Sequence, residues 1–74
     1  MSNTTKGEYR VGISFNPAND DTVGKIKRAA ADLIDLIDTI PARDGEVGRL
    51  IALAQTHIED GAMWAVKAAT KPAR

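Results

Sequence analysis

The sequence predicts an all-α protein, an antiparallel two-helix hairpin preceded by a short extended or irregular N-terminal segment. Two apolar patterns predict the hairpin, because in each of them apolar residues recur at spacings of three and four, the period of a helix face. A short link, PARDG at 41–45, separates the patterns, and helices joined by so short a link pack antiparallel. The apolar residues also exceed what one seam can bury, which predicts that copies of the hairpin assemble into a compact helical homo-oligomer.

The first part of the chain lacks a helical pattern. Residues 1–10 are mostly polar and are expected to form a flexible arm, followed by one helical-hairpin domain over 11–74. The stretch VGISF at 11–15 alternates apolar and small residues, as a short extended segment does. It ends at the turn signal Asn16-Pro17.

The first helix is expected to begin at Asp20 or Asp21, either of which can serve as its N-cap. It is expected to end just past Ile40, because Pro41 cannot continue a helix. Its apolar seam consists of Val23, Ile26, Ala30, Leu33, Ile37 and Ile40.

The second helix is expected to run from the link to Lys71-Pro72. Its apolar stripe consists of Val47, Leu50 or Ile51, Ala54, Ile58, Ala62, Ala65 and Ala69. Apolar residues beyond the two seams are Ala29, Leu36, Leu53, Met63 and Trp64. The indole of Trp64 offers a large apolar area among small residues that let helix backbones approach closely, so we interpret this stretch as a subunit contact. The alternative is that Trp64 caps the core of its own hairpin.

The composition excludes several classes of protein. A chain of 74 residues forms one small domain, whose core leaves a stability margin on the order of 3 to 5 kcal/mol. It has no cysteine, so disulfides and thiolate-bound metals are excluded and oligomerisation is the expected source of further stability. Ten basic and ten acidic residues cancel, which removes the positive field that binds DNA, RNA or anionic membranes. No apolar run has the length of a signal peptide or a membrane span, so the protein is expected to be soluble and intracellular.

No pattern typical of a catalytic, metal or cofactor site is found in the sequence. The one histidine lies in the second helix pattern, and no cysteine is available to accompany it. Asp32, Asp35 and Asp38 recur on one helix face and are interpreted as a solvated stripe. Glu59-Asp60 is interpreted as a surface pair. The protein is therefore expected to have no catalytic residue, no metal and no cofactor.

The lysines differ in whether an acidic residue lies within helical reach. Lys25 has Asp21 four residues before it. Lys27 has no acidic residue three or four positions away and borders the apolar seam, so it is expected to reach into a crevice between packed helices. Lys67 and Lys71 lie four apart near a helix C-terminus, where the helix dipole already favours positive charge. A ligand role for these two lysines is the alternative.

The stretch FNPAND at 15–20 places an aromatic residue, a rigid turn and the free amides of a helix start next to one another. An aromatic face that stacks on a base, beside amides and a lysine that hold phosphate, can bind a nucleotide. The alternative is that Phe15 seals the end of the hairpin core.

The stretches FNPANDDTVGKIKRAAADLI and LAQTHIEDGAMWAVKAATK resemble the phage anti-CBASS cyclic-nucleotide sponges, whose helical hairpin is shared with the first anti-Thoeris sponge. The most specific part is an acidic residue followed by Met-Trp-Ala, here Glu59 and residues 63–65. The aromatic-x-Pro turn, here Phe15 to Pro17, also fits. The similarity extends from about Ile13 to Lys71.

The resemblance implies a non-catalytic sponge. Such proteins form helical oligomers, typically hexamers, that bury cyclic dinucleotides or cyclic trinucleotides between protomers in the host cytoplasm and so keep CBASS effectors inactive. This chain is too short to carry the additional N-terminal sheet of the anti-Thoeris members, which favours the anti-CBASS branch.

The resemblance also implies roles for residues. It assigns base stacking to Phe15, with Tyr9 as the alternative, and phosphate binding to Lys27, with Lys25 as the less favoured choice. The ligand-binding residues expected on this basis are Phe15, Asn16, Pro17, Lys25 and Lys27, together with Thr70 and Lys71 for a trinucleotide.

Two other functions compete with the sponge. One is a structural or regulatory helical module that oligomerises and binds a host protein. The other is a small DNA-binding factor, which the zero net charge and the lack of a basic recognition helix disfavour.

Overall fold

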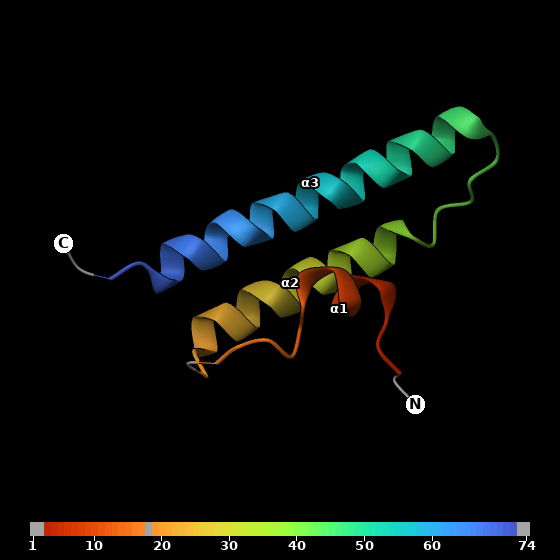
Figure 1. Ribbon diagram of the computed structural model, residues 1–74. Helices are drawn as coiled ribbons and strands as arrows, with labels where there is room; N and C mark the ends of the chain where they lie inside the picture. Colours follow the sequence, from red (N-terminus) through yellow and green to blue (C-terminus); the bar gives the residue numbers. More distant parts are fainter. Residues whose placement is uncertain (1–2, 18, 73–74) are drawn as a thin grey trace.

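The fold, seen in a computed structural model that describes residues 3–17 and 19–72, is an all-helical hairpin with a short additional helix. Helix α2 (Asp21–Ile37) and helix α3 (Gly45–Thr70) run antiparallel along each other (Figure 1). Helix α1 (Lys6–Val11) lies against α2 and makes fewer contacts with α3. The predicted all-α hairpin is confirmed, and the described residues contain no strand.

The ends of the two long helices differ from the expected ones by a few residues. Asp20 is the N-cap of α2, because its carboxylate accepts the N–H groups of Thr22 and Val23. Helix α2 ends at Ile37, before Pro41, because the N–H groups of Thr39 and Ile40 bond three residues back in a tighter turn. Asp44 caps α3 in the same way as Asp20 caps α2. The link is therefore longer than PARDG and runs over 38–44.

The flexible arm expected over residues 1–10 is wrong for Lys6–Arg10, which belong to α1. Thr5 and Glu8 form a capping box, in which the Thr5 hydroxyl accepts the Glu8 N–H and the Glu8 carboxylate accepts the Thr5 N–H. Gly12 ends the helix at φ 63°, a left-handed conformation that glycine adopts without strain. The domain boundary expected after residue 10 thus falls inside a helix, and residues 1–2 lie outside the described residues.

The extended segment expected at 11–15 is likewise replaced by other structure. Val11 ends α1, residues 12–14 form a turn, and Phe15 and Asn16 follow in irregular backbone. Of the two forms predicted for the N-terminal segment, extended or irregular, residues 12–16 therefore adopt the irregular one.

Helix α1 approaches α2 closely at Gly7. A Cβ atom at Gly7 would lie 2.1 Å from the Ala31 carbonyl oxygen, so only glycine fits this contact. The Gly7 N–H donates to a carboxylate oxygen of Asp35 at 2.7 Å. Asp35 is therefore an anchor for α1 and not part of a purely solvated stripe.

Ion pairs connect α1 to α2 and to the C-cap of α2. Lys6 Nζ lies 2.9 Å from Asp38 Oδ1, and Glu8 Oε2 lies 2.7 Å from Arg28 Nη1. These hydrogen bonds lower the pKa of the Glu8 and Asp38 carboxyl groups below their usual values. The buried residue of α1 is Gly7, and charged side chains of α1 form ion pairs, which explains why its docking left no apolar pattern in the sequence.

The buried side of α2 is rotated from the expected seam. The buried residues of α2 are Val23, Lys27, Ala31 and Ile34. Of the expected seam, Val23 is buried and Ile26, Ala30 and Ile37 are half-buried, whereas Leu33 and Ile40 are exposed. The physical reason is that α1 covers one flank of α2 while α3 covers the other, so the most buried residues lie between the two contacts.

The core also contains a polar residue of α3, Gln55, which is completely buried. Its amide nitrogen donates to the Ile34 carbonyl and to Asp38, each at 3.1 Å, and its amide oxygen accepts from Lys6 at 3.0 Å. Gln55 thus joins all three helices, because each of its polar atoms has a partner.

Large apolar side chains remain on the outside of the hairpin. Leu36, Met63 and Trp64 are each about 60% exposed. Trp64 therefore does not cap the core of its own hairpin, and its role as a subunit contact stays a prediction. None of the helices within 3–17 and 19–72 is both long and apolar enough to cross a membrane.

Candidate functional site

Lys27 is the centre of the candidate site. It extends from α2 under the turn that follows α1, and only 7% of the residue is exposed. Its ammonium donates to the Gly12 carbonyl oxygen at 3.0 Å and to the Phe15 carbonyl oxygen. Within residues 3–17 and 19–72 no ion pair joins Lys27 to a carboxylate. Two peptide dipoles therefore hold a full positive charge that a bound anion could neutralise.

The sequence prediction for Lys27 is thus correct in its geometry. Lys27 does reach into a crevice between packed elements, although its partners there are carbonyl groups of the turn at 12–15. The turn is placed by α1, because Gly12 both ends that helix and offers its carbonyl to the ammonium. The docking of α1 consequently positions one wall of the site.

Phe15 stands beside this lysine with its ring turned outward. The ring centroid is 5.3 Å from Lys27 Nζ, within the range of a cation–π interaction, and Phe15 is 72% exposed. Phe15 therefore does not seal the end of the hairpin core. Tyr9 is also exposed, at 81%, but Phe15 is the aromatic that contacts Lys27.

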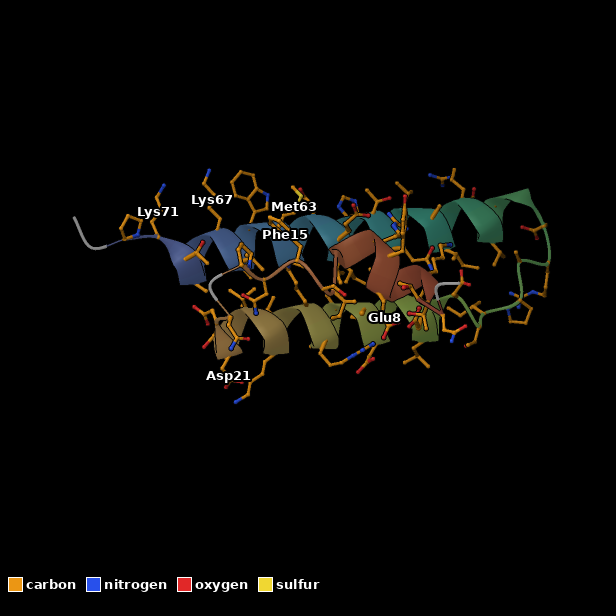
Figure 2. The ribbon with its side chains drawn as sticks, turned by 60° about the horizontal axis from the view of Figure 1, so that its bottom comes forward. Glu8, Phe15, Asp21, Met63, Lys67 and Lys71 are labelled. Atoms are coloured by element: carbon orange, nitrogen blue, oxygen red, sulfur yellow. The ribbon has the colours of Figure 1, made fainter. Side chains whose placement is uncertain are left out.

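Two cavities flank Phe15 and Lys27. The first, which we call the Glu59 cavity, has a volume of about 240 Å³ and is also lined by Arg10, Glu59 and Met63. Figure 2 shows Phe15 and Met63 on the same side of the hairpin. The second, which we call the Pro17 cavity, has a volume of about 340 Å³. Its lining includes five of the seven predicted ligand-binding residues: Phe15, Asn16, Pro17, Lys27 and Thr70.

Lys25 and Lys71 line neither cavity. The Lys25 side chain is 78% exposed and its ammonium lies 3.1 Å from Asp21, beside a separate open hollow at the start of α2. Lys71 is exposed at the C-terminal cap of α3 (Figure 2). Of the two candidate phosphate ligands, the geometry favours Lys27 over Lys25.

Asn16 and Thr70 use their polar groups within the protein. The Asn16 amide donates to the Asp20 carbonyl at 2.8 Å and accepts the Asp20 N–H at 3.0 Å. It therefore fixes the loop that leads into α2. The Thr70 hydroxyl donates to the Val66 carbonyl at 2.8 Å, one turn back on α3.

Sequence reasoning missed the pair of Arg10 and Glu59. Arg10 Nε lies 2.7 Å from Glu59 Oε1, and a second guanidinium nitrogen of Arg10 lies 3.2 Å from the Thr56 hydroxyl. Glu59 was expected to lie on the surface beside Asp60, but it is half-buried and pairs with Arg10 of α1. The available signal was the Thr5-x-x-Glu8 capping box, which indicates that Arg10 lies on a helix.

Comparison with known proteins adds one positive result. A family model described as "Acb2/Tad1, hairpin domain" matches residues 7–70, which include all three helices almost completely. No curated protein and no solved structure gives a significant match. The matched region contains Phe15, Lys27 and both cavities.

Proposed function

The chain belongs to the Acb2/Tad1 hairpin-domain family, the family of anti-CBASS and anti-Thoeris sponges, and from this premise we propose that it sequesters cyclic oligonucleotide second messengers. The ligand is a cyclic dinucleotide or a cyclic trinucleotide. Binding keeps it from CBASS effectors in the cytoplasm of a phage-infected host.

The observation that carries the proposal is the environment of Lys27. A lysine that is 7% exposed, has dipoles for partners and borders two cavities is suited to an anionic group. A phosphate oxygen can replace one of the two carbonyl partners and form a charge-assisted hydrogen bond, which is stronger than a bond to a neutral group. Lys27 is therefore proposed as the phosphate ligand.

Phe15 is proposed as the residue that stacks on a base. Its ring is exposed, lines both cavities and lies next to the proposed phosphate ligand. Stacking of a base on an aromatic side chain contributes about 1 to 3 kcal/mol. Tyr9 remains the alternative for this role.

A cyclic dinucleotide presents two phosphates and two bases, whereas one hairpin offers one Lys27 and one Phe15. Two copies related by a two-fold axis would supply a matching set. We therefore include assembly in the proposal, with the hexamer as the expected form and the outward Trp64 region as a contact between copies. Thr70 and Lys71 are kept as the proposed trinucleotide residues.

The proposed action is binding without cleavage, so the protein is not an enzyme in this account. The ligand is expected to return unchanged when the protein is unfolded. Polymeric DNA and RNA are not expected ligands, because the net charge is zero.

The test is a titration of the full chain with a panel of cyclic dinucleotides and trinucleotides, followed by Trp64 fluorescence and melting temperature. At about a hundredfold excess of free ligand over Kd, binding adds roughly 2.7 kcal/mol to the free energy of unfolding. For a domain of this size the melting temperature should rise by on the order of 10 °C. A linear dinucleotide of the same bases is the control. If no cyclic nucleotide raises the melting temperature, the chain is a structural module and the sponge proposal fails.

A further inference from the structure

The Glu59 cavity contains two charged side chains that phosphate binding and base stacking leave unused. Arg10 and Glu59 line it together with Lys27, Phe15 and Met63. The Arg10 side chain is 22% exposed and the Glu59 side chain is 35% exposed. Both are therefore accessible from the cavity, and neither is fully solvated. A fixed pair of opposite charges beside apolar side chains such as Phe15 and Met63 is an arrangement that orients a polar ligand.

The carboxylate of Glu59 has a free acceptor. Its Oε1 atom accepts from Arg10 Nε at 2.7 Å, and Arg10 is oriented in turn by the Thr56 hydroxyl. Within the part of the chain that the structure describes, no hydrogen bond engages Oε2 of Glu59. An ionised carboxylate only accepts hydrogen bonds, and its two oxygens offer about four lone-pair positions. Glu59 can therefore receive further N–H donors from a ligand.

The size of the cavity limits what part of a ligand it holds. Sites for ligands of drug size occupy roughly 300 to 1,000 Å³, whereas the Glu59 cavity has about 240 Å³. One base of a cyclic dinucleotide matches this space better than the whole molecule. Phe15 and Met63 supply apolar walls for the faces of that base.

We propose that the Glu59 cavity selects guanine, with Glu59 as the specificity-determining residue and Arg10 as the residue that positions it. This inference rests on the proposed function, since it identifies which cyclic nucleotides the site prefers. In the two copies that share one cyclic dinucleotide, the Glu59 cavity of each copy would receive one guanine.

Guanine and adenine differ in the groups that they offer to such a pair. Guanine presents N1–H and the N2 amino group side by side, two donors that a carboxylate accepts together. Adenine presents one amino donor next to the N1 acceptor, which a carboxylate repels. The guanidinium of Arg10 adds to the discrimination, because its N–H groups favour the guanine O6 acceptor and oppose the adenine amino group.

The test compares the affinities of the full chain for cyclic di-GMP and cyclic di-AMP by calorimetry. A well-placed pair of hydrogen bonds discriminates between bases by roughly tenfold or more, so cyclic di-GMP should bind at least about tenfold more tightly. The variant Glu59→Gln should reduce this ratio, because the amide of glutamine offers one donor and one acceptor and can match adenine. The variant Glu46→Gln is the matched control, since Glu46 pairs with Arg49 in the first turn of α3, and it should leave the ratio unchanged.

A ligand with one donor removed tests the same point without changing the protein. Cyclic di-IMP retains N1–H but lacks the N2 amino group, so its affinity for the unchanged chain should lie between those of the other two ligands. Equal affinities for all three ligands, or an unchanged ratio in folded Glu59→Gln, would overturn the selection of guanine while the sponge function stands. If the chain binds none of the three and no cyclic trinucleotide, the proposed function itself fails.

Discussion

Lys27 combines near-complete burial with a charge that no carboxylate balances within residues 3–17 and 19–72. The cost of burying such a charge is offset here by the Gly12 and Phe15 carbonyls and by the Phe15 ring. A ligand phosphate would lower that cost further. Lys27 holds the turn in the free protein, and in the proposed complex it would also bind the phosphate.

The variant Lys27→Met should weaken binding of a cyclic dinucleotide by about tenfold to a hundredfold, the value of one hydrogen bond to a charged group. Methionine retains a long apolar side chain but has no charge. Calorimetry with the preferred ligand measures the change. Because Lys27 also holds the turn, urea unfolding without ligand must show that the variant is folded.

Lys25→Met is the matched control for Lys27→Met. Lys25 is exposed and pairs with Asp21, so its loss should leave the affinity nearly unchanged. Abolished binding in Lys25→Met together with normal binding in folded Lys27→Met would show that the phosphate ligand is misassigned.

Single residues were predictable from the sequence where the deciding information was local. Lys27 stood out because its neighbours at helical spacing include no acidic residue. The pairing of Arg10 with Glu59 was not predictable in this way, because it joins residues 49 positions apart and depends on how α1 docks. The sequence distinguished Lys25 from Lys27 only because Lys25 has an acidic residue at helical spacing and Lys27 has none. The structure agrees, since Lys25 pairs with Asp21.

At the scale of helices, α1 is the element on which the site depends. A helix of six residues is not stable alone, so its contacts with α2 and α3 must hold it. These contacts are the close approach at Gly7 and the ion pairs of Lys6, Glu8 and Arg10. Since α1 leads directly into the turn over Lys27, loosening α1 should loosen the site.

The variant Gly7→Ala should displace α1, because the added Cβ would lie 2.1 Å from the Ala31 carbonyl oxygen and the contacting atom is backbone. Overpacking of this kind lowers the free energy of unfolding by about 1 to 3 kcal/mol. Urea unfolding measures the loss. The control is Gly61→Ala, where nothing lies within 4 Å of the added Cβ and the helix should gain about 0.5 to 1 kcal/mol. Equal stability of the two variants would contradict the docking of α1.

Acid should release α1 for an electrostatic reason. The pKa of Glu8 is lowered from its usual 4.5, mainly by its hydrogen bond with Arg28. The pKa of Asp38 is lowered from its usual 3.8, mainly by its hydrogen bond with Lys6. A lowered pKa in the folded state stabilises the fold above the unfolded pKa, and this stabilisation is lost as the pH falls through the folded value.

The melting temperature should therefore fall as the pH is lowered below about 4.5. The fall should be smaller in the variant Glu8→Gln, because this variant has no carboxyl group at position 8 to protonate. Circular dichroism at several pH values checks this, at constant ionic strength. A melting temperature that stays constant from pH 6 to about pH 3 would show that these carboxylates do not hold α1.

The long helices were predictable and α1 was not, for a physical reason. The helices α2 and α3 bury apolar faces, which leave a period of three and four in the sequence. Helix α1 docks through a glycine and charged side chains, so it leaves no apolar period. The buried residues of α2 differ from the expected seam for the same reason, because the sequence contains no sign that α1 also covers α2.

At the scale of the whole molecule, the hairpin leaves apolar side chains on its surface. Those on the long helices that are at least 42% exposed are Leu33, Leu36, Leu50, Leu53, Met63 and Trp64. Apolar surface of this kind is typical of proteins that associate. The sequence predicted the surplus of apolar residues, but neither the number of copies nor their arrangement follows from one chain.

The full chain should sediment as an oligomer, with a hexamer as the expected species, at micromolar concentration. The variant Trp64→Ala should weaken assembly by roughly thirtyfold or more, because a central aromatic contact contributes about 2 kcal/mol or more to binding. Sedimentation velocity measures both, with Arg43→Ala in the exposed link as the control. A monodisperse monomer would contradict assembly. It would also leave only one Lys27 for the two phosphates of a cyclic dinucleotide.

The central claim, sequestration without destruction, is tested most directly with a purified CBASS effector and its cyclic nucleotide activator. Adding the full chain in excess should abolish effector activity. Heating the mixture to unfold the chain, followed by fresh effector, should restore that activity because the released ligand is intact. Uninhibited effector activity, or activity that does not return after heating, would contradict the account.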